Sequence, residues 1–279
     1  MRIIRNEKFD EERALYSSDG IELYSTAFDG PADGESALKE SKNIYAEDCY
    51  FNLRYPLWHC TGVTLSECKM TELCRAALWY TDGIEIKGSK LEGIKALREC
   101  KNIKVSDSFI SSAELFWFSD GIELDSDEIS GEYCMLRSKN IKAENLTFKG
   151  KYSFQYIENA TFDGCDFDTK DAFWHARNVV VRNSRVKGEY LAWYSENVTF
   201  ENCEIVGTQP LCYCKGLKLI NCTMTDCDLS FELSEVEATL LNSPTSIKNP
   251  KHGRISLPSP TELILDGESA CEILSPAFR

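Results

Sequence analysis

The chain has few of the features that assign a protein to a functional class. It has 3 histidines, no pair of C-x-x-C units, and no apolar run close to the roughly 20 residues that span a bilayer. Lysine and arginine number 31 against 45 aspartates and glutamates, so the clustered cations that hold phosphate backbones are missing. The first residues contain no sustained apolar stretch of the secretory type. We therefore expect no nucleic-acid or membrane partner, no metal, no cofactor, and a cytoplasmic location.

The cysteines are numerous but do not fit a disulfide scaffold. Such scaffolds are typical of small secreted chains with an even number of cysteines, and this chain has 279 residues and 13 cysteines. We predict reduced thiols that pack as small hydrophobic side chains. Eight of them recur at two small positions of a repeat: Cys49, Cys68, Cys165, Cys203 and Cys222 at one, and Cys60, Cys100 and Cys214 at the other.

A short phrase recurs along the chain at a nearly constant spacing. Its first residue, here called the mark, is a glycine or an asparagine, and from Gly83 to Gly216 successive marks are nineteen residues apart. The marks are Gly20, Asn43, Gly62, Gly83, Asn102, Gly121, Asn140, Asn159, Asn178, Asn197 and Gly216. The earlier steps are 23, 19 and 21, and the extra residues of the first fit a Gly/Pro loop at 29–35. A fixed period of this length predicts stacked structural units.

The residues after each mark alternate as in a strand. Positions one and three after the mark are apolar, and the residue between them is mostly polar. A second short strand follows a bend at residues such as Asn202. A nineteen-residue coil that holds several strands has no room for a helix, so each strand should pair in parallel with its copies in the neighbouring coils. We predict an all-β, single-stranded, right-handed parallel β-helix of about 12 coils, its handedness taken from the general chirality of parallel crossovers.

The two ends of such a fold need protection, because an open end exposes an unpaired coil. We predict a β-helix over residues 1–242 that begins with a covering strand. Residues 243–279 contain five prolines and are predicted to form a C-terminal capping tail. Within this tail the stretch 261–269 resembles the repeated phrase and is expected to add one further rung.

Two kinds of phrase carry a family resemblance. One is "ALWYTDGI" (77–84) and the other "KNIKVSDSF" (101–109). With the repeat, they make the chain similar to the pectin-lyase-like β-helix superfamily. More narrowly, it resembles an uncharacterised bacterial domain-of-unknown-function family within it. The resemblance covers residues 13–242 and implies the fold, but it implies no activity.

All five tryptophans fall in one column of the repeat, shortly before the marks: Trp58, Trp79, Trp117, Trp174 and Trp193. The next column contains His59, Tyr80, His175 and Tyr194 among others. If this segment is a strand, adjacent columns point to opposite faces. Strict alternation places the tryptophans inside, whereas the presence of Lys39, Arg98 and Gln155 in their column favours exposure. We expect the tryptophans to be at least partly exposed.

An aromatic column that repeats on every coil suggests a surface for an extended glycan. The predicted ligand-binding residues are Trp174, Trp193, His175, Tyr194, Trp58, His59, Trp79 and Tyr80. The alternative is a structural or protein-interaction rod in which the aromatic column only stiffens the fold, and the oligomeric state is left open. A further alternative is a polysaccharide lyase or glycoside hydrolase.

Catalytic candidates are few. Asp171, His175 and Arg177 lie on one coil with Glu189 on the next, and a histidine beside a carboxylate can transfer protons near neutral pH. Arg185 and Lys187 stand nineteen residues after Asp166 and Asp168, so we expect these two pairs to be ion pairs between neighbouring coils.

Overall fold

The structure is a computed structural model, and it describes residues 2–31 and 35–276. Part of the predicted Gly/Pro loop at 29–35, the first residue and the last three residues of the predicted tail therefore lie outside the described residues. The chain divides into two compact units, Met1–Lys142 and Ala143–Arg279. Each unit is described by itself.

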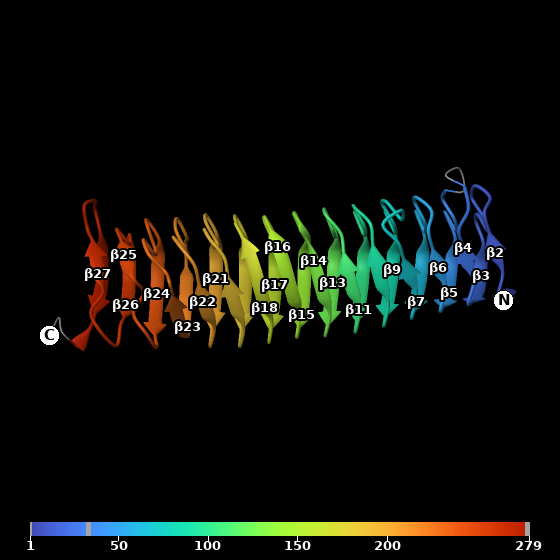
Figure 1. The fold of residues 1–279 in the computed structure, drawn as a ribbon. Helices are drawn as coiled ribbons and strands as arrows, with labels where there is room; N and C mark the ends of the chain where they lie inside the picture. Colours follow the sequence, from blue (N-terminus) through green and yellow to red (C-terminus); the bar gives the residue numbers. More distant parts are fainter. Residues whose placement is uncertain (1, 32–34, 277–279) are drawn as a thin grey trace. The chain divides into compact units, whose positions relative to one another are not determined.

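Two ladders of parallel strands build the first unit (Figure 1). The A ladder contains β1 (Arg2–Arg5), β3 (Asp19–Tyr24), β5 (Lys42–Glu47), β7 (Thr61–Ser66), β9 (Asp82–Lys87), β11 (Lys101–Ser106) and β13 (Asp120–Asp125). The B ladder contains β2 (Lys8–Phe9), β4 (Ala27–Phe28), β6 (Tyr50–Phe51), β8 (Lys69–Met70), β10 (Lys90–Glu92), β12 (Phe109–Ser111) and β14 (Glu128–Glu132). Equivalent residues of successive coils are paired, as in Ile84, Ile103 and Ile122, so the repeat sets the register.

The second unit repeats this plan. Its A ladder contains β17 (Glu158–Asp163), β19 (Arg177–Arg182), β21 (Glu196–Glu201), β23 (Leu217–Thr225), β24 (Glu235–Leu240), β26 (His252–Ser256) and β28 (Ala270–Leu274). Its B ladder contains β16 (Thr147–Lys151), β18 (Asp166–Lys170), β20 (Arg185–Lys187), β22 (Glu204–Val206) and the end of β23. A separate pair is formed by β25 (Ser246–Lys248) and β27 (Glu262–Ile264), and β15 (Lys139–Glu144) spans the division between the units.

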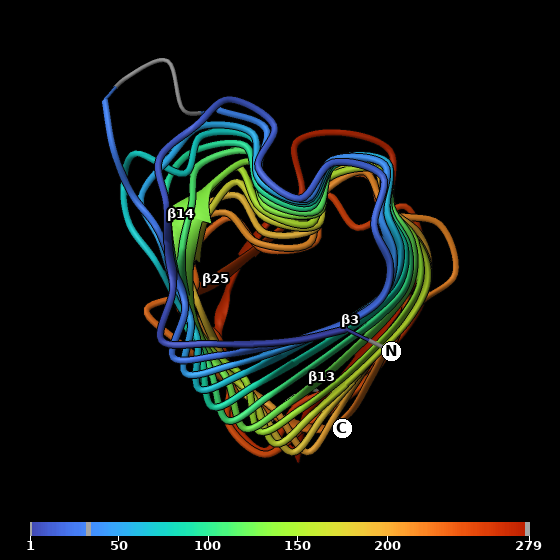
Figure 2. The same cartoon turned by 90° about the vertical axis from the view of Figure 1, so that its right-hand side faces the viewer.

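The predicted fold is confirmed: an all-β, single-stranded parallel β-solenoid of about 14 turns of about 19 residues. Figure 2 views the first unit from its N-terminal end. The chain runs clockwise from β3 to the side that carries β14 as it moves away from the viewer, so the coils are right-handed. The turns exceed the predicted 12 because pairing continues after residue 242: β26 pairs with β24, and β28 with β26. A capping role for residues 243–276 stays a prediction.

The core consists of inward columns of the two ladders and of the cysteines. All 13 cysteines are free thiols, and 12 of them are buried, including the eight predicted from the repeat. Their thiols donate to backbone carbonyls, as Cys60 Sγ does to Leu38 O of the preceding coil at 3.1 Å. Burial raises the pKa of Cys60 to about 12. The cysteines therefore pack as small apolar residues, as predicted.

The residues that the structure describes contain no helix long and apolar enough to cross a membrane. The predicted ion pairs between coils are present in the second unit. Lys187 Nζ lies 3.1 Å from Asp168 Oδ2, and Arg185 Nη1 lies 3.5 Å from Asp166 Oδ1. Arg185 also contacts Glu204 of the following coil at 3.3 Å, so these charges form a surface ladder.

Candidate functional site

The aromatic columns belong to a third segment of each coil, and this segment is not a strand. In the coil that contains Trp58, every second residue has a left-handed backbone, with φ of +58° at Tyr55, +60° at Leu57 and +54° at His59. The N–H of Leu57 donates to Ala37 O in the preceding coil, and that of His59 to Trp79 O in the following coil, both at 2.9 Å. Hydrogen bonds in both directions offset a left-handed cost of about 1–2 kcal/mol per residue.

This backbone corrects the expectation that adjacent columns point to opposite faces. Leu57 is fully buried, Trp58 is half-buried and His59 is exposed, so both aromatic columns face outward to different extents. The same pattern recurs at Leu78 and Trp79 with their neighbour in the outer column. We call the tryptophan column the inner aromatic column and the His/Tyr column the outer aromatic column. The prediction that the tryptophans are partly exposed is confirmed.

The inner aromatic column also holds neighbouring coils together. The indole Nε1 of Trp174 donates to Tyr190 O at 2.6 Å, and that of Trp193 donates to Gln209 O at 2.8 Å. In the first unit, Trp117 Nε1 makes the equivalent hydrogen bond to Tyr133 O at 2.5 Å. The tryptophans are therefore structural as well as accessible.

Cations in this column lie against tryptophan rings. The guanidinium carbon of Arg98 lies 5.2 Å from the ring centre of Trp79 and 5.6 Å from that of Trp117. Lys39 Nζ lies 6.0 Å from the ring centre of Trp58. These are cation–π distances, so a half-buried position next to an aromatic ring accommodates a cation.

Within each unit the aromatic rings stack on one another. The ring centres of Tyr156 and His175 are 4.7 Å apart, those of His175 and Tyr194 are 5.1 Å apart, and those of Tyr194 and Tyr213 are 4.8 Å apart. Trp174 and Trp193 stack at 5.4 Å, and in the first unit Trp58 and Trp79 stack at 5.1 Å, as His59 and Tyr80 do at 4.7 Å. Stacking covers the ring faces and leaves the edges outward. A ligand that packs on a ring face therefore needs a break in the column.

Two of the four catalytic candidates of the second unit form ion pairs with residues outside the group. Glu189 Oε2 pairs with Lys170 Nζ at 2.9 Å, and Arg177 Nε lies 3.5 Å from Glu196 Oε2. Among the described residues no hydrogen bond joins Asp171 to His175. Burial raises the pKa of Asp171, and burial followed by the Arg177 cation lowers the pKa of His175. A catalytic role for these residues stays a prediction.

The outer aromatic column of the first unit is interrupted at Glu99, between Tyr80 and Phe118. Beside this break lies a cavity of about 430 Å³, lined by Arg98, Glu99, Cys100, Lys101, Phe118 and Asp120. We call it the Glu99 cavity. It forms where a carboxylate replaces a ring, because the shorter side chain cannot fill the space. Phe118 is 41% exposed, so part of its ring remains accessible to a ligand.

Three of the four charged side chains that line the Glu99 cavity, those of Arg98, Glu99 and Asp120, are held by contacts with other residues. The side chain of Arg98 is flanked by two tryptophan rings, and its Nε lies 3.3 Å from Glu99 Oε1. The terminal guanidinium nitrogens of Arg98 make no hydrogen bond with any residue that the structure describes. Asp120 Oδ1 accepts from Asn140 Nδ2 at 2.6 Å. The cavity therefore offers a preorganised donor, two carboxylates and an aromatic ring.

This cavity was missed in the sequence analysis, although its signal is present. Arg98 and Glu99 interrupt both aromatic columns on the same coil. The sequence analysis used Arg98 only as an argument that the tryptophan column is exposed. The groups of three or more His, Cys, Asp and Glu residues that could hold a metal ion are absent from the described part of the chain.

Comparisons with known proteins were made among curated sequences, solved structures and family models. A search among curated proteins finds no match. Among solved structures it is similar to the A-module of the mannuronan C-5 epimerase AlgE4 of Azotobacter vinelandii, with 10% identity over 85% of this chain and 88% of that chain and a TM-score of 0.39. It is also similar to ORF18 of Geobacillus virus E2, with 8% identity over 86% and 52% and a TM-score of 0.36. For the Dettilon tailspike protein the identity is 12% over 99% and 62%, with a TM-score of 0.33.

One family model matches nearly the whole chain, over residues 2–273. It therefore covers both compact units, the A and B ladders and the two aromatic columns. The narrower resemblance predicted from the repeated phrases is confirmed. The chain belongs to the family described as "Protein of unknown function (DUF3737)".

Proposed function

We propose that the protein binds a carbohydrate, an extended glycan, on its aromatic columns, and that one sugar ring of this glycan occupies the Glu99 cavity. The observation that carries the proposal is the cavity itself, about 430 Å³ at Glu99, between the rings of Tyr80 and Phe118 in the outer aromatic column. Ligand sites are typically concave, of roughly 300–1,000 Å³, with a few polar groups placed around apolar surface.

The lining of the cavity suits a sugar in its chemistry. A pyranose ring has apolar C–H faces and hydroxyl groups around its edge, so it needs a flat apolar surface together with hydrogen-bond donors and acceptors. Phe118 supplies the exposed part of its ring, although the guanidinium carbon of Arg98 lies over that ring at 5.4 Å from its centre. Arg98 supplies donors, and Glu99 supplies acceptors. Hydrogen bonds to charged groups are roughly twice as strong as neutral ones, which favours binding of uncharged hydroxyls at such a site.

The stacked rings would extend the site along the first unit. Rings at 4.7 Å spacing present the edges of His59 and Tyr80 on successive coils, where the imidazole and hydroxyl groups can bond further sugars. In the second unit, Trp174, Trp193, His175 and Tyr194 offer the same kind of edge, and their role in glycan binding stays a prediction. We propose binding without a catalytic step.

We also propose a cytoplasmic location. All 13 cysteines are free thiols, and none of the described residues forms a disulfide. Proteins of oxidising compartments commonly use disulfides, whereas reducing compartments keep thiols free. Fractionation of the native host cell, with the protein detected by antibody, tests this location, and recovery from an extracytoplasmic fraction would contradict it.

A glycan array followed by thermal-shift titration tests the proposed function. A bound oligosaccharide should raise the Tm by mass action, and Phe118→Ala and Arg98→Gln should each weaken its affinity at least tenfold. Phe109→Ala, which removes a half-buried ring of β12 away from the cavity, is the matched control and should bind like the wild type. If no oligosaccharide binds, or if binding survives in both cavity variants, the proposal is wrong.

A further inference from the structure

A second hollow of the first unit lies where successive coils leave the B ladder and enter the third segment. Its volume is about 520 Å³, and its lining includes Glu72, Leu73, Arg75, Ile94, Ser111 and Ser130. We call it the Leu73 groove. None of the residues that line it lines the Glu99 cavity, and no aromatic ring contributes to it.

The groove begins at a two-residue insertion. The step from Gly62 to Gly83 is 21 residues instead of 19, and the additional residues fall within 71–75. The N–H of Cys74 donates to Thr71 O at 2.9 Å, which closes a turn, and Cys74 Sγ donates to Phe51 O at 3.0 Å from a fully buried position. This turn leaves Leu73 59% exposed. The leucine is therefore held outward by a turn that is anchored in the core.

A glycine in the following coil completes the groove. Gly93 has φ of +113°, and a Cβ atom on it would lie 3.0 Å from Cys74 O and 3.2 Å from Thr71 O. Only glycine combines this backbone with such close packing against the turn. The next residue, Ile94, is 43% exposed. Two aliphatic side chains on neighbouring coils are thus exposed to solvent, and both line the same groove.

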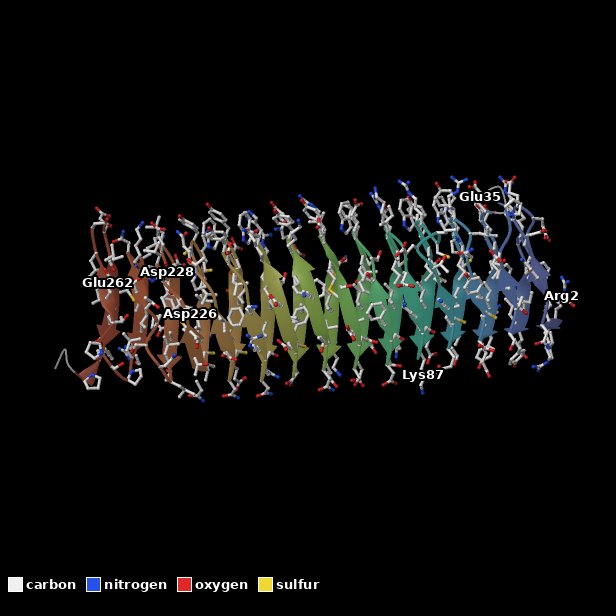
Figure 3. The ribbon with its side chains drawn as sticks, in the orientation of Figure 1. Arg2, Glu35, Lys87, Asp226, Asp228 and Glu262 are labelled. Atoms are coloured by element: carbon white, nitrogen blue, oxygen red, sulfur yellow. The ribbon has the colours of Figure 1, made fainter. Side chains whose placement is uncertain are left out.

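The charges of the groove are only partly neutralised. Arg54 Nη2 forms an ion pair with Glu35 Oε2 at 3.0 Å. In Figure 3, Glu35 lies at the upper edge of the first unit and Lys87 at the lower edge. Arg75 and Glu72 form no ion pair with any residue that the structure describes. Arg75 can therefore pair with a single carboxylate of a ligand, while Glu72 disfavours a ligand that carries several negative charges.

We propose that the Leu73 groove binds an extended segment of a partner polypeptide, in which aliphatic side chains stand beside an acidic one. The aliphatic side chains would contact Leu73 and Ile94, and the carboxylate would pair with Arg75. Ser130 Oγ donates to Ser111 Oγ at 3.1 Å, so the Ser111 hydroxyl can still donate to a peptide carbonyl, a bond that a hydrocarbon chain cannot accept. Without an aromatic ring the groove lacks the flat surface that a sugar needs, and Glu72 repels a polyanion.

The length of the groove agrees with a short peptide. Its lining residues come from four to five successive coils, which at about 4.8 Å per coil extend over roughly 15–20 Å. An extended peptide advances about 3.3 Å per residue, so five or six residues cover this length. The proposal is independent of glycan binding, because the two sites share no residue.

Phage selection with a library of random linear heptapeptides tests the proposal, with the Leu73→Ser/Ile94→Ser double variant for counter-selection. Enriched sequences should combine aliphatic residues with Asp or Glu. As synthetic fluorescent peptides they should bind the double variant at least tenfold more weakly in a polarisation titration. Arg75→Gln should weaken an acidic peptide at least fivefold and leave its Glu→Gln or Asp→Asn counterpart nearly unchanged. The control Leu241→Ser, which changes a leucine that is 60% exposed in the second unit, should bind like the wild type.

Three outcomes would overturn the proposal. The first is a selection that gives no shared sequence, and the second is a set of peptides that bind the double variant as tightly as the wild type. The third is tight binding of laurate or myristate that requires Leu73 and Ile94 while no selected peptide does. Equal thermal midpoints of the wild type and the double variant show that the fold is intact. Phe118→Ala should leave peptide binding unchanged, which separates this test from that of the proposed function.

Discussion

Gln155 and Trp174 stand one coil apart in the same column, and their side chains make the same hydrogen bond. Gln155 Nε2 donates to Asp171 O at 3.0 Å, and Trp174 Nε1 donates to Tyr190 O, each to the residue three positions before the column in the following coil. In these two coils an amide N–H and an indole N–H therefore fill the same structural role in the inner aromatic column.

This equivalence predicts the effects of two substitutions. Gln155→Leu removes the donor from a part-buried carbonyl and should lower the free energy of unfolding by about 1 kcal/mol. Gln155→Trp restores a donor that can reach the same carbonyl and should be at least as stable as the wild type. Urea unfolding midpoints of the three proteins check this. Equal midpoints for Gln155→Leu and the wild type would show that the hydrogen bond contributes nothing.

A second prediction concerns the left-handed backbone of the third segment. Leu233 has φ of +53° and is 49% exposed, and its N–H donates to Asn249 O at 3.0 Å. Leu233→Gly keeps this hydrogen bond and relieves a left-handed cost of about 1–2 kcal/mol. Leu241→Gly, at an exposed leucine outside the left-handed region, carries only the entropic cost of glycine, about 0.5–1 kcal/mol.

We therefore expect Leu233→Gly to be more stable than Leu241→Gly by at least about 1 kcal/mol. Thermal and urea unfolding of both variants provide the comparison. If the two substitutions destabilise the protein equally, the left-handed positions carry no strain.

A third prediction concerns thiol reactivity. Cys271 is the one cysteine that is half-buried, and burial raises its pKa to about 11. Native protein at pH 8 should therefore react slowly with a small thiol reagent at one position, and faster at pH 10, where more of the Cys271 thiolate is present. Mass spectrometry should show one adduct per native chain, none in Cys271→Ser, and 13 in the unfolded wild type. Rapid native labelling at several positions would contradict the packed thiol columns.

A fourth prediction concerns pH. Asp127 is buried at a position that serine occupies in the two preceding coils, and burial raises its pKa from 3.8 to about 6. Between these pH values the unfolded carboxyl loses its proton first, so stability falls as the pH rises through this window. At 1.36 kcal/mol per pH unit the loss is at most about 3 kcal/mol.

Asp127→Asn removes this titration. The variant should be more stable than the wild type at pH 8 and nearly equal to it at pH 3.5, because the wild-type carboxyl is protonated there. Asp127→Ser, which restores the residue type of the two preceding coils, should remove the same pH dependence. Urea unfolding at the two pH values checks this, and a constant difference between Asp127→Asn and the wild type would rule out the titration.

The sequence predicted the ladders because period-two alternation and a constant step specify parallel pairing directly. Ile84, Ile103 and Ile122 are paired as their spacing requires. The orientation of the third segment was not predictable in the same way, because every second residue of its backbone has a positive φ. Bulky residues such as Leu57 and Phe116 carry positive φ there, which their residue types do not indicate.

The candidate site was predictable only in part. The partial exposure of the tryptophans follows from the polar residues in their column. The Glu99 cavity, in contrast, depends on the volume that a short side chain leaves empty between two aromatic rings, and this volume cannot be read from the sequence. The Leu73 groove had a visible signal, the 21-residue step, but only coordinates show that the inserted turn displays Leu73 while it buries Cys74.

The hydrogen bonds that tie each third segment to both neighbouring coils have a consequence for the evolution of this surface. Those of Leu57 and His59 are made by backbone atoms, so they persist whichever side chains occupy the inner and outer columns, and the indole N–H of a tryptophan adds a further one. The Glu99 cavity then depends on two consecutive residues, an arginine followed by a glutamate, and the same pair could form a similar cavity on another coil. An arginine–glutamate pair at positions 79–80 and a tryptophan–tyrosine pair at 98–99 would relocate the cavity by one coil, with loss of the hydrogen bond from Trp79 Nε1 to Lys95 O and with the strand ladders kept. New specificities can thus arise in this family by exchange of residues within columns, with no change of loop length or topology.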